Sequence, residues 1–212
     1  MDMVKSLKSA GIIPVIVIDN IDTAVPLAKA LVAGGLPVLE VTFRTACAAE
    51  AIAKIKAEVP GAILIAGTVL KLDQLKAAKD AGAEACVAPG FDPMIVKAAN
   101  EMGMPFCPGV ATASELSQAL SLGCQMVKFF PAESAGGVKY IKDLLGAFRW
   151  TGVKIMPTGG VKPSNVRDYL SVPEIVACGG TWIAPKDAIA AGDWAKIEAL
   201  AAEAAAIARE FA

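Results

Sequence analysis

The sequence of 212 residues contains no histidine. Histidine is the commonest metal ligand and the commonest general base in enzymes, so its absence argues against a Ser-His-Asp hydrolase or a zinc hydrolase of the usual kind. Proton transfer in this protein would have to use carboxylates, lysines, tyrosines or water. We expect neither a metal ion nor an organic cofactor.

Long apolar runs and paired cysteines are also missing. The longest stretch without a charged residue is 102–114, only 13 residues, whereas a membrane-spanning helix needs about 20 apolar residues. The five cysteines form no C-x-x-C pair and mostly lie in apolar runs, which is typical of reduced core residues in a cytosolic protein. The start of the chain superficially resembles a signal peptide, but Pro14 interrupts its apolar part and no small-residue cleavage site follows. We therefore predict a cytoplasmic protein with no membrane partner.

The charge is nearly balanced, with 20 basic and 21 acidic residues. No basic stripe with interleaved aromatic residues is present, so we expect no nucleic-acid partner. Hydrophobic residues make up 55% of the chain and the mean hydropathy is +0.55. Both values are high for a monomer, which indicates that a second copy covers some of the apolar surface.

Short apolar runs alternate with segments of helical periodicity throughout the chain. The predicted strands are 12–18, 38–43, 62–66, 85–88, 104–107, 126–130, 153–157 and 175–178. The predicted helices are 23–33, 48–58, 73–81, 93–102, 113–120, 138–145, 164–170 and 194–211. Eight such units predict an α/β fold, a single-domain (β/α)8 TIM barrel over residues 1–212, with a helix in 1–9 that caps the barrel bottom. The alternative is an open, doubly wound sheet.

Lys128 lies in the apolar run 126–131, where a charged ammonium group is costly unless it is paired or used. Burial favours the neutral amine, a nucleophile that can condense with a carbonyl group to form a Schiff base. The alternative is a lysine at a strand end whose ammonium reaches solvent, and the hexapeptide alone favours that alternative. The neighbouring strands bear on the choice.

Glu40, Thr42 and Arg44 fall on one face of the second predicted strand, because side chains two apart share a face. The second and sixth strands of an eight-stranded barrel are opposite one another, so Glu40 and Lys128 could meet across its interior. A buried structural salt bridge is the alternative. Arg44 is either an exposed charge at a strand end or a ligand of a substrate carboxylate, which its guanidinium suits, and its presence beside the pair favours a site.

Two Gly-Gly pairs follow the seventh and eighth predicted strands, at 159–160 and 179–180. The loops after these two strands hold phosphate in many barrels, because glycine lets backbone N–H groups approach it closely. Ordinary turn glycines are the alternative. Gly67 and Thr68 after the third strand, and Pro89 and Gly90 after the fourth, add a hydroxyl and a tight turn at the same rim.

Six motifs together resemble the 2-keto-3-deoxy-6-phosphogluconate (KDPG) aldolase family. They are IPVIV at 13–17, LEVTFRT at 39–45, AGTVL at 66–70, KFFPAE at 128–133, PTGGV at 157–161 and GGTW at 179–182. The resemblance implies a homotrimeric class I aldolase of the Entner–Doudoroff pathway, a lyase that cleaves KDPG to pyruvate and glyceraldehyde 3-phosphate without a metal. It also implies cleavage of 4-hydroxy-2-oxoglutarate (KHG) to pyruvate and glyoxylate.

The resemblance also assigns roles to individual positions. Lys128 would form the Schiff base and Glu40 would transfer protons. The other implied contacts are Arg44 and Thr68 for the substrate carboxylate, Phe130 and Pro89 for the imine pocket, Thr158 for a substrate hydroxyl, and Gly159, Gly160, Gly180 and Thr181 for the phosphate. The sequence departs from the family pattern at Thr181 and Ala88, where the family has serine.

Two other functions are compatible with a barrel of this kind. One is a phosphosugar epimerase or decarboxylase, although the chain lacks the metal-binding or clustered acidic and histidine residues that such enzymes use. The other is a non-catalytic assembly subunit, natural or engineered, which the high apolar fraction would suit. The combination of Glu40, Arg44 and Lys128 favours the aldolase.

Overall fold

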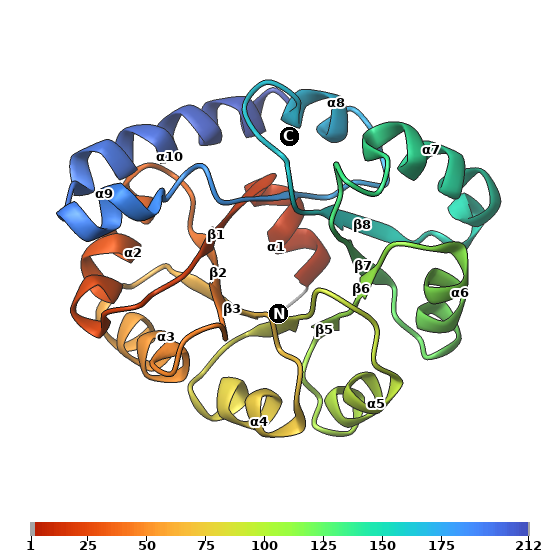
Figure 1. Ribbon diagram of the computed structural model, residues 1–212, viewed down its shortest axis with the longest axis horizontal. Helices are drawn as coiled ribbons and strands as arrows, with labels where there is room; N and C mark the ends of the chain where they lie inside the picture. Colours follow the sequence, from red (N-terminus) through yellow and green to blue (C-terminus); the bar gives the residue numbers. More distant parts are fainter. Residues whose placement is uncertain (1–2, 212) are drawn as a thin grey trace.

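The computed structural model describes residues 3–211, in which strands and helices alternate (Figure 1). The strands are β1 (Ile12–Ile16), β2 (Val38–Thr42), β3 (Ile63–Gly67), β4 (Ala85–Val87), β5 (Phe106–Cys107), β6 (Gly109–Val110), β7 (Met126–Phe129), β8 (Lys154–Pro157) and β9 (Cys178–Gly180). The α-helices are α1 (Met3–Ala10), α2 (Ala24–Ala33), α3 (Ala48–Glu58), α4 (Leu72–Asp80), α5 (Pro93–Glu101), α6 (Ala113–Ser121), α7 (Gly137–Phe148), α8 (Val166–Leu170), α9 (Lys186–Ala191) and α10 (Trp194–Arg209). Two 3-10 helices, η1 (Ile21–Thr23) and η2 (Arg149–Thr151), complete the described elements.

The strands form a curled parallel sheet in two parts. Six strands lie in the order β5-β4-β3-β2-β1-β9, and three in the order β6-β7-β8. Two isolated bridges, Ile155 with Ile175 and Thr158 with Gly179, connect the β8 region to the segment that ends in β9. Figure 1 shows α2 to α10 arranged around the outside of the strands. The helices therefore cover one face of the sheet, unlike those of the doubly wound alternative.

Side chains of successive strand residues separate into two apolar layers. Ile12, Leu64 and Val127 pack outward in the cluster shared with the helices. The residues that follow or precede them, such as Ile13 and Met126, belong to a smaller cluster on the inner face. This period of two is the one that the sequence predicts for strands, and it determines which side chains face the interior.

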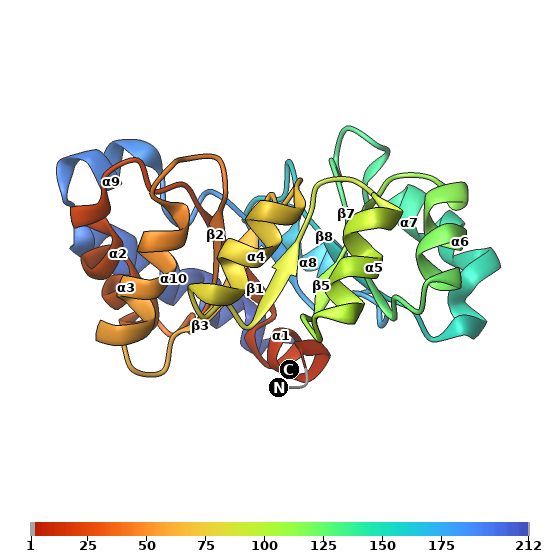
Figure 2. The ribbon, with the colours of Figure 1, turned by 90° about the horizontal axis from the view of Figure 1, so that it is seen from below.

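Helix α1 packs at the amino ends of the strands, at the lower side of Figure 2. Its Leu7 is buried in the inner cluster with Ile13 and Val38, which lie near the amino ends of β1 and β2. This cluster fills the interior beneath the carboxyl ends of the strands. The predicted helix in 1–9 is thus observed over Met3–Ala10, and residues 1 and 2 lie outside the described part.

Three predictions of secondary structure were wrong in detail. The fifth strand is divided at Pro108, which has no N–H to donate to a neighbouring strand. The eighth strand is Cys178–Gly180 and not 175–178, so Gly179 and Gly180 belong to a strand and not to the loop after it. Helix α9 was missed. Glycine is depleted in strands, so the sequence gave little reason to place one at 178–180.

Candidate active site

Lys128 and Glu40 meet on the inner face of the curled sheet. Lys128 shares the inner face of β7 with Met126, and Glu40 shares that of β2 with Val38. The Lys128 Nζ donates to Glu40 Oε1 at 2.9 Å and to Oε2 at 3.2 Å. Their side chains are only 5% and 1% exposed. The prediction that these two side chains meet is confirmed.

This buried ion pair is better suited to chemistry than to stabilising the fold. Burial removes both ions from water, and the cost of desolvation offsets most of their attraction. An ammonium group cannot attack a carbonyl carbon until it loses a proton. The Glu40 carboxylate is within hydrogen-bonding distance and can accept that proton.

An aromatic ring and a neutral thiol lie near the ion pair. The Phe130 ring centroid lies 5.9 Å from Lys128 Nζ, within the range of a cation–π contact. Burial raises the pKa of the Cys107 thiol, so the thiol next to the pair stays neutral. The Pro89 backbone packs against Gly109, the residue that pairs with Lys128 in the parallel register. Phe130 therefore lies beside the lysine, and Pro89 lies beside the strand that pairs with it.

Arg44 and Thr68 come together at the carboxyl ends of β2 and β3. The Arg44 Nε donates to Thr68 Oγ1 at 3.4 Å, and Arg44 is exposed while Thr68 is half-buried. Thr68 has φ of 58°, the only positive φ of a non-glycine residue within 3–211. A β-branched residue in this region is strained, and such strain is concentrated at functional sites. Both residues present polar groups to the same rim.

The turn at 158–160 follows β8. Gly159 and Gly160 have φ of 98° and 79°, which side chains with a Cβ rarely adopt. Thr158 is 5% exposed, and its Oγ1 has no hydrogen-bond partner within the described residues. Because a buried hydroxyl without a partner is costly, this group is available to a ligand at the mouth of the site.

Gly180 and Thr181 differ from their predicted setting. Gly180 is a buried strand residue, and an ideal Cβ there would lie 1.8 Å from the Trp182 ring. The glycine is therefore required by the packing of Trp182, whatever else it does. Thr181 is exposed directly after the strand. Gly179 lies beside Thr158, since an ideal Cβ at 179 would be 2.4 Å from Thr158 Oγ1, and the two strand ends are thus close together.

Gly67 is a site residue whose importance the sequence did not reveal. An ideal Cβ at this position would lie 2.4 Å from Glu40 Oε1 and 2.6 Å from Glu40 Cγ. The glycine leaves the space that the carboxylate needs in order to reach Lys128. A glycine at a strand end is an ordinary sequence feature, so only the packing of β2 against β3 reveals this role.

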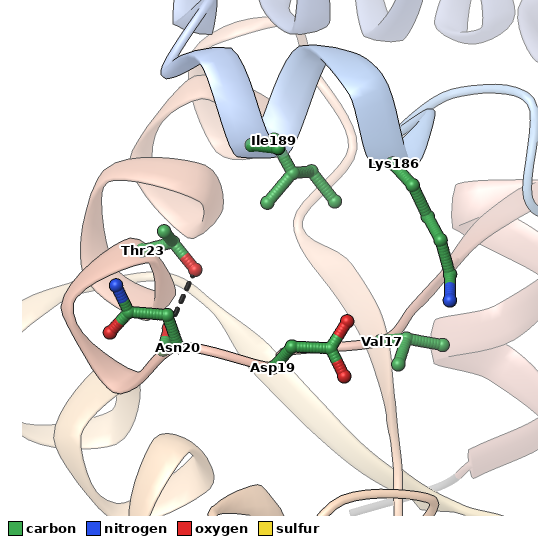
Figure 3. A pocket seen from close by; sticks show the side chains of 7 residues that line it. Val17, Asp19, Asn20, Thr23, Lys186 and Ile189 are labelled. Atoms are coloured by element: carbon green, nitrogen blue, oxygen red, sulfur yellow. Dashed lines mark hydrogen bonds between the residues drawn. The ribbon is translucent and has the colours of Figure 1, made fainter.

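A cavity of about 180 Å³ lies beside the mouth, between the residues after β1 and helix α9. Figure 3 shows Asp19 and Lys186 extending toward it, together with Val17 and Ile189. Neither Lys128 nor Glu40 lines it. We therefore place the candidate site at the ion pair and not in this cavity.

Two further observations concern binding groups and membranes. Between residues 3 and 211, no three His, Cys, Asp or Glu side chains are grouped as metal ligands. In the same part of the chain, no helix combines the length and the apolarity needed to cross a bilayer.

Together, a parallel α/β fold and a buried lysine paired with a glutamate at the carboxyl ends of the strands define a class of enzyme that forms Schiff bases with carbonyl substrates. The model of the KDPG and KHG aldolase family matches residues 3–200. The chain belongs to this family, and its members are aldolases, which are lyases.

Individual relatives agree with this assignment. The KHG/KDPG aldolase of Escherichia coli strain K12 is 48% identical over 198 residues, covering 93% of this chain and 92% of its own length. The KDPG aldolase of Zymomonas mobilis ZM4, solved with 3-phosphoglycerate, is 45% identical with a TM-score of 0.90. The match covers 97% of this chain and 96% of that one. The KDPG aldolase of Legionella pneumophila, with pyruvate captured at low pH as a covalent carbinolamine intermediate, is 38% identical with a TM-score of 0.91. The match covers 95% of this chain and 97% of that one.

Replacing Gly67 with alanine should separate Glu40 from Lys128, because the added methyl group occupies the space of the carboxylate. We expect aldolase activity to fall at least about tenfold and the free energy of unfolding to fall by roughly 1–3 kcal/mol. Gly90→Ala is the matched control, since it lies at the same rim and an ideal Cβ there has no neighbour within 4 Å. Equal activity of the two variants would contradict this role of Gly67.

Proposed function

We propose that this chain cleaves KDPG to pyruvate and glyceraldehyde 3-phosphate as a class I aldolase of the Entner–Doudoroff pathway, and that it also cleaves KHG to pyruvate and glyoxylate. The observation that carries the proposal is the buried contact between Lys128 and Glu40 in a chain of this family. The carbinolamine in the Legionella pneumophila relative supports a covalent route through a lysine.

In the first stage of the proposed mechanism, Glu40 accepts a proton from Lys128. The neutral amine then adds to the C2 ketone of the substrate, and the resulting carbinolamine loses water to give a protonated imine. Glu40 moves the protons of this dehydration, either directly or through a water molecule.

In the second stage, the C4 hydroxyl gives its proton to Glu40 as the C3–C4 bond breaks. The bonding electrons move into the protonated imine, C4 becomes the aldehyde carbon of glyceraldehyde 3-phosphate, and C3 remains in an enamine on Lys128. Protonation of C3 and hydrolysis of the imine release pyruvate and restore the amine.

The remaining candidate residues would hold the two ends of the substrate. Arg44 and Thr68 would bind the carboxylate, since a guanidinium suits a carboxylate and the hydroxyl lies beside it. Phe130 and Pro89 would form the walls of the imine pocket. The Thr158 hydroxyl, which has no hydrogen-bond partner within the described residues, would bind a substrate hydroxyl. Gly159, Gly160, Gly180 and Thr181 would bind the phosphate, which the relative solved with 3-phosphoglycerate makes reasonable. Thr181 keeps the hydroxyl of the family serine, whereas Ala88 does not.

We also propose that the two parts of the sheet close into one (β/α)8 barrel capped by α1, in a single domain. Three features support closure: β5 and β6 belong to one segment interrupted by Pro108, and two bridges join the β8 region to the β9 segment.

For the assembly we propose a homotrimer. Leu70, Leu72 and Met94 are 51%, 50% and 66% exposed, and burying them against another copy would remove them from water.

A cytoplasmic location is proposed on the basis of the cysteines. All five are free, and burial raises the pKa of the Cys86 thiol to about 12 and that of Cys178 above its ordinary value. Neutral buried thiols suit a reducing compartment.

The two alternative functions, a phosphosugar epimerase or decarboxylase and a non-catalytic assembly subunit, are less well supported. The chain belongs to an aldolase family, and its Lys128 and Glu40 are in contact.

Replacing Glu40 with glutamine should lower kcat for KDPG cleavage by about 10²-fold or more, because the amide cannot accept the protons that the carboxylate moves. Glu174→Gln is the matched control: it is also a buried glutamate, paired with Arg149 at 2.7 Å and away from Lys128. We expect that control to change stability but not kcat. Steady-state assays of pyruvate release measure both, and wild-type turnover in Glu40→Gln would refute the proposed role.

Replacing Thr158 with valine should lower kcat/KM for KDPG by about two- to tenfold, the effect of one lost hydrogen bond. The melting temperature should not fall, because the hydroxyl is buried without a protein partner. Thr42→Val is the control, since its buried Oγ1 donates to the Ile16 carbonyl at 3.0 Å and its loss should lower stability. A stability loss in Thr158→Val with unchanged kinetics would show a purely structural residue.

A further inference from the structure

Glu133 and Tyr169 form a hydrogen bond that the mechanism above does not use. Glu133 is exposed in the segment after β7, and its Oε1 accepts a hydrogen bond from the Tyr169 hydroxyl of α8. Tyr169 is only 1% exposed. The bond joins two segments that are 36 residues apart in the sequence, and both lie next to the turn at 158–160.

The Glu133 side chain packs directly against this turn. An ideal Cβ at Gly160 would lie 2.6 Å from both Cβ and Cγ of Glu133, so the two methylene carbons fill the space beside the glycine. The Glu133 N–H also donates to the Gly159 carbonyl at 3.0 Å. On another side, Asn165 Nδ2 donates to the Gly160 carbonyl at 3.2 Å. The shape of the turn therefore depends on where Glu133 lies.

The charge of Glu133 is unfavourable at this place. A carboxylate that moved over the turn would repel a bound phosphate, which is itself an anion. The Tyr169 hydroxyl prevents this movement by holding Oε1. Burial raises the pKa of Tyr169, and the hydrogen bond to Glu133 raises it further. The hydroxyl therefore remains a donor at neutral pH.

We propose that Glu133 is a positioning residue for the substrate phosphate: its methylene groups shape the turn at 158–160, and the Tyr169 hydroxyl holds its carboxylate away from the phosphate. The proposal rests on the proposed function and adds to it the residues that favour a phosphorylated substrate over an unphosphorylated one. Neither side chain touches the reacting carbons, so neither is a catalytic residue.

The primary test is Tyr169→Phe, which removes the donor and keeps the buried ring. We expect KM for KDPG to rise about three- to tenfold, because one hydrogen bond is lost and the Glu133 carboxylate is then free to approach the phosphate. The kcat and KM for KHG, which has no phosphate, should stay at wild-type values. Tyr140→Phe is the matched control, because its ring stacks on Phe129 with centroids 5.8 Å apart and it is not part of the pair.

Two glutamine variants separate the charge from the packing. Glu133→Gln keeps the acceptor oxygen and the methylene groups, so its KM for KDPG should be no higher than that of the wild type. In the double variant, Tyr169→Phe with Glu133→Gln, residue 133 is uncharged and cannot repel the phosphate. Its KM for KDPG should therefore return toward the wild-type value. Thermal unfolding of each variant establishes that it folds.

Three results would overturn the inference: an unchanged KM for KDPG in folded Tyr169→Phe, equal increases for KDPG and KHG, or no recovery in the double variant. Failure of the proposed function is distinguishable, since it is seen in the wild type as cleavage of neither substrate.

Discussion

The contact between Lys128 and Glu40 is the interaction on which the arrangement of the candidate site depends. It joins β7 to β2 across the inner face of the curled sheet, and both partners are buried. Two charges can be kept there only in contact with each other, because either one alone would lose its hydration without compensation. Gly67 makes room for the contact beside the carboxylate, whereas Gly109 allows the Pro89 backbone to pass close to the strand that pairs with β7.

The apolar layers explain why the pair occupies this level of the interior. Leu7 of α1, Val38 and Met126 fill the space toward the amino ends of the strands. A substrate therefore has access to the pair only from the carboxyl ends. There Arg44, Thr68 and the turn at 158–160 present polar groups, as the proposed binding of a substrate with a carboxylate and a phosphate requires.

Much of this could be predicted from the sequence because parallel strands buried on both faces are apolar runs with a period of two. That period placed Glu40 and Lys128 on the inner face, and helix 48–58 was predicted with the bounds that the structure has. The short strand Cys178–Gly180 was misplaced because its glycines reflect packing against Thr158 and Trp182 and carry no strand signal. The bond between Glu133 and Tyr169 was invisible for a similar reason: it joins distant segments, and neither residue lies in a pattern that predicts the other.

The most direct test of the account is reductive trapping of pyruvate with borohydride, followed by peptide mapping with mass spectrometry. The account predicts a single pyruvate adduct on Lys128, the buried lysine within hydrogen-bonding distance of Glu40. Lys154 and Lys139 serve as internal references, since the first is half-buried in β8 and the second is paired with Asp143 on the exposed face of α7. An adduct on either of these lysines, or none on Lys128 in the folded protein, would contradict the account.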